Sequence, residues 1–575
     1  MSLGLIEKQV MWNRLLAIVE EQAQVLQRTA FSTIVRESGD LAAGVFDASG
    51  RMLAQAVTGT PGHINSMALA VGHVIAKHPV RTMRPGDVFI HNDPWIGTGH
   101  TNDFSVTTPC FRDGVFVGLL ACNCHLLDIG GSRSGVGTLD VFMEGLFLPI
   151  LRIVEEGIVN QTLMDVIGAN TRLPVETVGD VYALISCNEI GCERLIEMMD
   201  EFRLDALDSL AGHIISASRT AMLERIRELP RGTWSASLTL DGQDDEPVEL
   251  RATLTVSDDG IDVDYSGTSP MVRHNFNVPL CYTLAYTSYA LGCILARDIP
   301  NNAGSLEPRR VRAEPGSIVH ASKPAAVVQR HLIGLMLPDL VFGCLRQAIP
   351  DRIPAEGAGV LWNITGSGPR SSPAVMGDDF LVNIVTTGGM GALPSQDGLS
   401  ATGFPSGVRG GPVEIFESMS TLVFWRKQYR EGSGGAGATR GGLGQDIVIG
   451  NSLDEPFSIT TAYERLRFPA RGYTGGQPGA RGYIGLASGA PLPGKGRHHV
   501  PARDRIVICS PGGGGLGDPL SRDPALVRQD LEQGLITEEA ATRDYQRQAH
   551  SPEPSPHAGS VDLPGDVPGQ PPETM

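Results

Sequence analysis

The spacing of apolar residues along the chain first predicts helices. Residues 5–30 contain neither glycine nor proline and place apolar side chains at near-helical intervals, at Ile6, Val10, Leu15, Ile18, Val25 and Leu26. Such a stripe is typical of a long amphipathic helix. The same texture predicts helices at 66–78, 176–188, 189–229, 278–297 and 331–348, and a helical pair at 524–548 with Gly534 between its members and Thr537 as an N-cap.

Runs with β-type composition predict strands joined by tight turns. We expect a hairpin within 39–55 around the turn Asp47–Gly50, and a strand at Val88–Ile90. A second hairpin should pair 104–110 with 115–123, because Asp113-Gly114 lies between two β-type runs and Asp-Gly is a strong hairpin signal.

The pattern changes after residue 232. Segments 234–242, 248–260 and 261–269 alternate apolar and polar residues around an Asp-Asp-Gly turn, which predicts a β-meander. We therefore expect an α+β, multi-domain fold of hairpins, meanders, long helices and glycine-rich loops. Its regions would be 1–232, 233–550 and a disordered, proline-rich tail at 551–575.

Residue types that commonly bind metals are expected to come together at the open end of the second hairpin. Asp103 lies about ten residues before the Asp113-Gly114 turn and His125 about twelve after it, so the pairing makes them neighbours. His100, in the loop before the first strand, can reach the same point. Two imidazoles and a carboxylate suit Zn²⁺, Fe²⁺ or Mn²⁺.

Other interpretations of this cluster stay open. His100 is also compatible with an ordinary loop histidine and His125 with a half-buried strand end. Cys122 and Cys124 are possible soft ligands, but cysteines alternating on a strand are more typical of a core. Asp40 ends the first hairpin and is a cap residue unless the two hairpins lie side by side, in which case it reaches the same site.

Composition limits the possible partners and compartments. The 46 Lys and Arg residues against 64 Asp and Glu give a net charge of −18, which argues against nucleic acid or an anionic membrane as the partner. Nine cysteines, an odd number mostly within apolar runs, favour a reduced, cytoplasmic protein. The glycine-rich segments 432–445 and 510–520 fit no nucleotide-binding fingerprint, so tight turns are favoured over phosphate loops.

Several separate blocks of sequence resemble the hydantoinase B/oxoprolinase family, the β-type subunit of ATP-dependent cyclic-amide hydrolases. The resemblance runs from the first helix to about Tyr545. The blocks are RTAFSTIVRESGD, VFDASGRMLAQ, PGDVFIHNDPWIGTGHTNDF, CHLLDIGG, DYSGTSP, IPNNAG, GGAGATRGGLGQ and SPGGGGLGDPLSRDP. Their occurrence in family order is more specific than any single block.

The resemblance implies a two-subunit enzyme with a metal site. A hydantoinase A-type partner would bind ATP and phosphorylate the substrate, and the B-type subunit would hold a divalent metal, Zn most readily, or Mn or Fe. The implied ligands fall on Asp40, His100, Asp103 and His125. An α2β2 hetero-oligomer is the assembly that the family suggests.

The chain departs from the family pattern after His125. A second histidine often follows in the family, but Leu126 stands here. If that histidine normally moves protons, the role passes to Asp128, His63 or His91, each of which is also compatible with a loop hydrogen-bonding residue.

The expected activity is hydrolysis of a phosphorylated lactam or hydantoin. Phosphorylation of the carbonyl oxygen removes amide resonance, and a metal ion can activate water for the attack. One alternative is a ketone carboxylase of the acetone or acetophenone type, and another is a non-catalytic scaffold that completes the partner's site.

Overall fold

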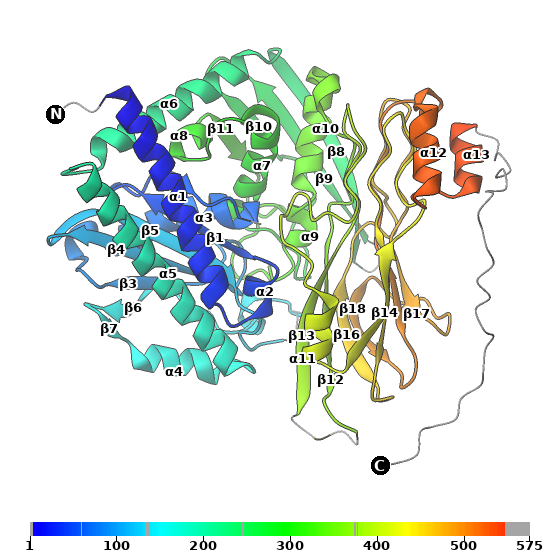
Figure 1. Ribbon diagram of the computed structural model, residues 1–575, viewed down its shortest axis with the longest axis horizontal. Coiled ribbons are helices and arrows are strands. Elements are labelled where there is room, and N and C mark those ends of the chain that lie inside the picture. The colour runs from blue at the N-terminus through cyan, green and yellow to red at the C-terminus, as the bar shows by residue number, and fades with distance from the viewer. Residues whose placement is uncertain are drawn as a thin grey trace, which may run out of the picture.

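The computed structural model describes residues 4–546 except 59, 133–136, 244–245, 373–374 and 376–377. The tail predicted at 551–575 lies outside the described residues. The N-terminus lies on the left of Figure 1 and the helices α12 (Pro524–Glu532) and α13 (Glu538–Tyr545) lie on the right, with the other helices and the mainly antiparallel sheets between them. This confirms the α+β class.

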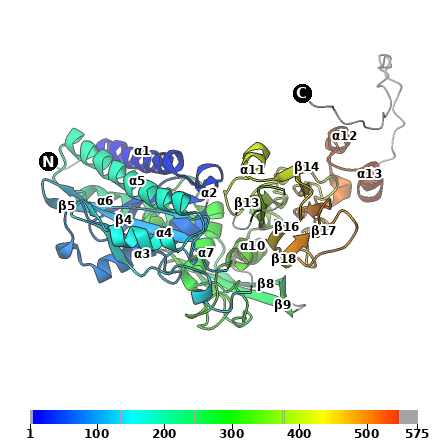
Figure 2. The ribbon, with the colours of Figure 1, turned by 90° about the horizontal axis from the view of Figure 1, so that it is seen from below.

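The N-terminal region is a seven-stranded sheet between helices. Its strand order is β2-β1-β5-β4-β3-β6-β7. Helices α1 and α5 lie side by side over one face (Figures 1 and 2), and α3 packs on the other. The elements are α1 (Leu5–Thr29), α2 (Thr33–Arg36), β1 (Leu41–Phe46), β2 (Met52–Gln55), α3 (Pro61–Lys77), β3 (Val88–His91), β4 (Asp103–Arg112), β5 (Val115–His125), β6 (Leu151–Glu155), β7 (Ile158–Val159), α4 (Gln161–Ala169), α5 (Pro174–Glu201) and α6 (Asp208–Arg227).

Two details of the predicted helices were wrong. Ile6 and Val10 of α1 are exposed, and the buried stripe begins at Met11. The helix expected at 189–229 is two helices, because α5 continues to Glu201 and ends where Arg203 adopts a left-handed φ of 52°. Leu204 N–H then donates to the carbonyl of Met199, which ends the helix. The left-handed residue at such a helix end is usually glycine, so Arg203 gave no sequence signal for the break.

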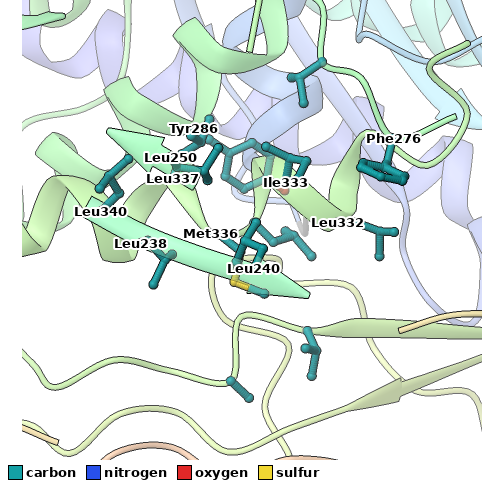
Figure 3. Packing of buried hydrophobic residues seen from close by; sticks show 14 of the residues in the cluster. Leu238, Leu240, Leu250, Phe276, Tyr286, Leu332, Ile333, Met336, Leu337 and Leu340 are labelled. Carbon is teal, nitrogen blue, oxygen red and sulfur yellow. The ribbon is translucent and has the colours of Figure 1, made fainter. Parts of the chain in front are cut away.

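The middle region contains the predicted meander. β8 (Gly232–Gln243), β9 (Glu246–Val256) and β10 (Ile261–Asp264) are antiparallel, and β11 (Arg309–Arg312) adds in parallel to β10. Figure 3 shows Leu238, Leu240 and Leu250 of this sheet packed against Met336, Leu337 and Leu340. The helices here are α7 (Leu280–Leu295), α8 (Ala303–Leu306), α9 (His331–Gly334) and α10 (Leu337–Ala348).

The C-terminal region has two further four-stranded sheets, β13-β12-β16-β18 and β14-β15-β19-β17. Thr537 caps α13 and Gly534 adopts a φ of 65° between α12 and α13, as predicted. The boundary proposed at residue 233 stays a prediction. The elements are β12 (Leu361–Pro369), β13 (Asp379–Thr387), α11 (Val413–Met419), β14 (Leu422–Tyr429), β15 (Gln445–Asn451), β16 (Phe457–Ala462), β17 (Tyr483–Leu486), β18 (Lys495–Val500), β19 (Ile506–Cys509), α12 (Pro524–Glu532) and α13 (Glu538–Tyr545).

The glycine-rich segments pack backbone against backbone. A Cβ added at Gly441 would lie 2.0 Å from the carbonyl oxygen of Gly513, and one added at Gly513 would lie 2.0 Å from that of Met390. Their N–H groups donate within the bundle, for example from Gly513 to Gly442 at 3.0 Å and from Gly435 to Gly513 at 2.8 Å. These amides are used between segments, which argues against the phosphate-loop alternative.

This packing makes Gly513 intolerant of a side chain. We expect Gly513→Ala to lower the free energy of unfolding by about 3 kcal/mol, because the new methyl group has no space beside Met390. Gly212→Ala is the matched control, since Gly212 is exposed in α6 and a Cβ there would meet open space, so alanine should stabilise by about 1 kcal/mol. Urea unfolding of both variants measures the change in the free energy of unfolding. Equal changes would contradict the close packing of the glycine-rich segments.

Candidate active site

Strand pairing brings three of the four predicted ligands together at the ends of neighbouring interior strands of the N-terminal sheet. Asp103 and His125 are direct cross-strand partners in β4 and β5. β1 lies on the other side of β5, where Leu41 pairs with Cys124 and the N–H of His125 donates to the carbonyl of Asp40 at 3.1 Å. The two predicted hairpins therefore lie side by side, the condition under which Asp40 reaches the site.

The carboxylate of Asp103 is the centre of the cluster. Its Oδ1 lies 2.9 Å from His125 Nδ1 and 3.7 Å from His100 Nδ1. Its Oδ2 lies 2.9 Å from His63 Nε2 and accepts hydrogen bonds of 2.6 Å from both Thr98 Oγ1 and Arg330 Nη2. The Asp103 side chain is fully buried, so these partners replace its hydration.

The donor set fits a divalent metal. One ligand atom each of His100, Asp103 and His125 lie within 4.8 Å of one another. Burial, with the charge of Arg330, lowers the pKa of His100 well below its usual range and keeps it neutral. Burial alone would raise the pKa of Asp103, but His63, Arg330 and His100 lower it far below normal, so the carboxylate stays ionised. Neutral imidazole and ionised carboxylate are the forms that bind metal.

Asp40 and His63 border this donor set. Asp40 Oδ1 accepts a hydrogen bond of 2.6 Å from Thr60 Oγ1 and lies 3.3 Å from His63 Nδ1. Burial lowers the pKa of His63, but the charges of Asp103 and Asp40 outweigh it and the pKa is raised. His63 thus joins the two carboxylates.

The cluster opens into a cavity of about 130 Å³. Its walls include the ends of the N-terminal strands with the start of α3, the segment around Arg330, residues of α7, and the sheet that contains β12, β13 and β16. The acidic, histidine and arginine residues among the described lining residues are Asp40, His63, His100, His125, Asp128, Glu144, Arg330 and His331. None of them comes from the sheet that contains β12, β13 and β16.

The three predicted proton-transfer residues have different surroundings. His63 lines the cavity within the cluster. Asp128 also lines it, but Arg172 Nη1 lies 2.6 Å from Asp128 Oδ1 and the backbone N–H of Arg172 occupies Oδ2. His91 is buried and is not among the described residues that line the cavity, and burial lowers its pKa to about 4. The geometry favours His63 of the three.

The predicted soft-ligand alternative lies on the wrong face of β5. Cys122 and Cys124 pack with Cys187 of α5 in the core, and burial raises the pKa of both thiols well above normal. They belong to the core rather than to the His100, Asp103 and His125 set.

Sequence reasoning missed several lining residues: Glu144, Arg330, His331, Asn363 and Asn383. Arg330 is 227 positions from its partner Asp103, and no local pattern relates the two. His331 begins α9, its Nε2 has no hydrogen-bond partner among the described residues, and burial beside Arg330 lowers its pKa to about 3. The only available signal was the run Gln329-Arg330-His331 at the start of the helix predicted at 331–348.

Comparison with known proteins identifies the family. The family model for hydantoinase B/oxoprolinase matches residues 5–519. The chain belongs to this family. The resemblance inferred from the sequence blocks is therefore confirmed.

Relatives of this hydantoinase B/oxoprolinase chain include subunits and longer enzymes. It is 29% identical to a D-/L-hydantoinase subunit of Pseudomonas sp. (strain NS671), over 94% of each chain. It is 28% identical to 5-oxoprolinase 1 of Arabidopsis thaliana, over 88% of this chain, and spans 41% of that longer protein.

Two solved structures share the fold. The ATP-dependent caprolactamase of Pseudomonas jessenii aligns with a TM-score of 0.85 at 24% identity, over 96% of this chain and 97% of its own. Acetone carboxylase aligns with a TM-score of 0.81 at 19% identity, over 93% of this chain and 79% of its own. Within the described residues, none of the helices has the length and apolar character needed to cross a membrane.

Glu144 connects the cavity to the segment that carries Arg330. Its Oε1 accepts hydrogen bonds from the N–H groups of Val327 and Val328 at 2.6 and 2.8 Å. Burial raises the pKa of Glu144 from 4.5 to about 7, although these bonds oppose the shift. The native state therefore binds this proton more tightly than the unfolded chain.

This shift predicts a pH-dependent contribution to stability. Because the folded pKa is the higher one, the contribution is complete below about pH 4.5 and is lost as the pH rises through about 7. Glu144→Gln keeps an acceptor for both N–H groups but does not titrate, so its stability relative to wild type should rise by on the order of 3 kcal/mol from about pH 4 to pH 8. Urea unfolding across this range measures it, with exposed Glu532→Gln as the control. A wild-type-like slope in Glu144→Gln would contradict the assignment.

Proposed function

We propose that this chain is the metal-bearing subunit of an ATP-dependent cyclic amide hydrolase, acting on a substrate that a hydantoinase A-type partner phosphorylates. The observation that carries the proposal is the buried cluster of His63, His100, Asp103 and His125 at one wall of a cavity. Relatives named as a hydantoinase subunit and as 5-oxoprolinases support the substrate class.

The residues of this chain would divide the work as follows. His100, Asp103 and His125, with Asp40 beside them, would hold a divalent metal. When bound, such an ion supplies Lewis acidity and activates water for attack on the phosphorylated amide carbon. Arg330 positions Asp103 through the 2.6 Å contact at Oδ2.

His63 is the residue best placed to move a proton. Its Nε2 is fixed on Asp103, and its Nδ1 lies beside Asp40 with no hydrogen-bond partner among the described residues. Its raised pKa favours the protonated form, which suits delivery of a proton to the departing ring nitrogen. ATP would be bound by the partner, and an α2β2 assembly is part of the proposal.

Metal content provides the first test. His100→Ala and His125→Ala should each reduce the bound divalent metal to background, because each removes one of only two imidazole donors, and should abolish turnover of the complex. Inductively coupled plasma mass spectrometry of the purified complex measures the metal. Exposed His499→Ala is the matched control and should change neither quantity. Unchanged metal and turnover in the cluster variants would support a scaffold role.

Product analysis separates the hydrolase from a ketone carboxylase. The complex with its A-type partner would be given ATP and ¹³C-bicarbonate with a lactam, a hydantoin and a methyl ketone in turn. We expect unlabelled, ring-opened product from the cyclic amides and none from the ketone. Label in a β-keto acid would overturn the hydrolase and assign the same cluster to carboxylation.

A further inference from the structure

The wall of the cavity that faces the ionic cluster is built from a sheet. Alternate residues of β12 point toward the cavity, namely Leu361, Asn363 and Thr365, while Trp362 and Ile364 between them are buried in the core. The neighbouring strands add Leu381 and Asn383 from β13 and Thr460 from β16. These six residues are the sheet wall.

The sheet wall is uncharged and partly polar, with two asparagines, two threonines and two leucines. Thr365 pairs with Asn383 on one side and with Thr460 on the other, so amide and hydroxyl groups form a row across three strands. None of the six has an ionisable side chain. Among the described lining residues, Arg330 is the only Lys or Arg, and Asp103 and the carbonyl of Thr98 already accept from it.

Two amides of the sheet wall have unused hydrogen-bonding capacity. The Oδ1 atoms of Asn363 and Asn383 are both buried and have no partner among the described residues. The strands β12 and β13 place them as diagonal neighbours, because Asn363 pairs with Val385, two positions from Asn383. A buried carbonyl oxygen without a donor is costly, so a ligand that supplies N–H groups there is favoured. Since a side-chain amide can present either oxygen or nitrogen after a flip, each can also donate to a ligand carbonyl.

We infer that Asn363 and Asn383 recognise a second amide of the substrate, and that the substrate is a neutral cyclic ureide or imide. This inference rests on the proposed hydrolase function and narrows its substrate class. The reacting amide faces the cluster at Asp103, and the far edge of the ring presents N–H and C=O groups to the two asparagines. An all-methylene lactam leaves both amides unsatisfied, and a lactam with a carboxylate finds no cation on the sheet wall.

The test compares three cyclic amides in the complex with its A-type partner and ATP. Hydantoin has a second amide, ε-caprolactam has only methylenes, and 5-oxoproline carries a carboxylate. We expect hydantoin to have the highest kcat/KM. Asn363→Leu and Asn383→Leu should each lower kcat/KM for hydantoin about tenfold, mainly through KM, and leave or raise that for caprolactam.

Controls separate recognition from folding. Asn13→Ala, at an exposed position of α1, should change no kinetic constant. If a leucine variant does not fold, Asn363→Ala and Asn383→Ala make the same comparison at smaller volume. Equal loss on all three substrates, or a preference for 5-oxoproline that the asparagine variants do not alter, would overturn the inference.

Equilibrium binding of hydantoin to the complex without ATP separates this inference from the proposed function. If no cyclic amide is opened but the leucine variants still weaken hydantoin binding about tenfold, the hydrolase proposal fails and the recognition role stands. If caprolactam is opened and the variants neither weaken hydantoin binding nor alter selectivity, the hydrolase stands and the recognition role fails.

Discussion

The buried carboxylate of Asp103 is the constraint on which the site depends. An ionised carboxylate without water needs several partners, and Asp103 has them from four directions: His63, Thr98, His125 and Arg330. Arg330 comes from the middle region, so satisfying Asp103 also fixes that region against the N-terminal sheet. The segment that carries Arg330 is held in turn by Glu144, which accepts from two of its N–H groups. The same charged and polar contacts therefore stabilise both the site and the packing of the middle region on the N-terminal sheet.

The part of the site that the sequence predicted is the part set by local strand geometry. Asp103 and His125 lie at similar distances along the chain before and after the Asp113-Gly114 turn. The Asp-Gly signal was therefore sufficient to predict them as cross-strand neighbours. Asp40 required one further condition, the pairing of β1 with β5, which single-sequence reasoning leaves open. Arg330 and Asn383 come from distant elements whose packing no periodicity specifies, so they were out of reach.

The fold shows the same division between local and non-local information. Alternation and turns located the meander and the helical pair near the C-terminus, but the break at Arg203 lacked the glycine that normally marks such a helix end. The glycine-rich segments were recognised as structural and do contain turn glycines such as Gly432 and Gly517, but other glycines in them serve close backbone packing rather than turns. Gly441, Gly442 and Gly513 are needed because neighbouring backbones occupy the volume of a Cβ, a requirement visible only when the segments are packed together.

The two walls of the cavity differ in how much change they tolerate. Removing Asp103 leaves the buried Arg330 without its carboxylate partner, which costs about 3–5 kcal/mol, and also takes away the shared partner of His63, Thr98 and His125. By contrast, neither Oδ1 of Asn363 nor that of Asn383 has a hydrogen-bond partner among the described residues, so replacing either residue would remove only a neutral hydrogen bond to the ligand, worth about 1 kcal/mol. Substitutions in the sheet wall are therefore expected to change which ring the cavity accepts. They can do so because the sheet wall can change without unfolding the ionic cluster opposite.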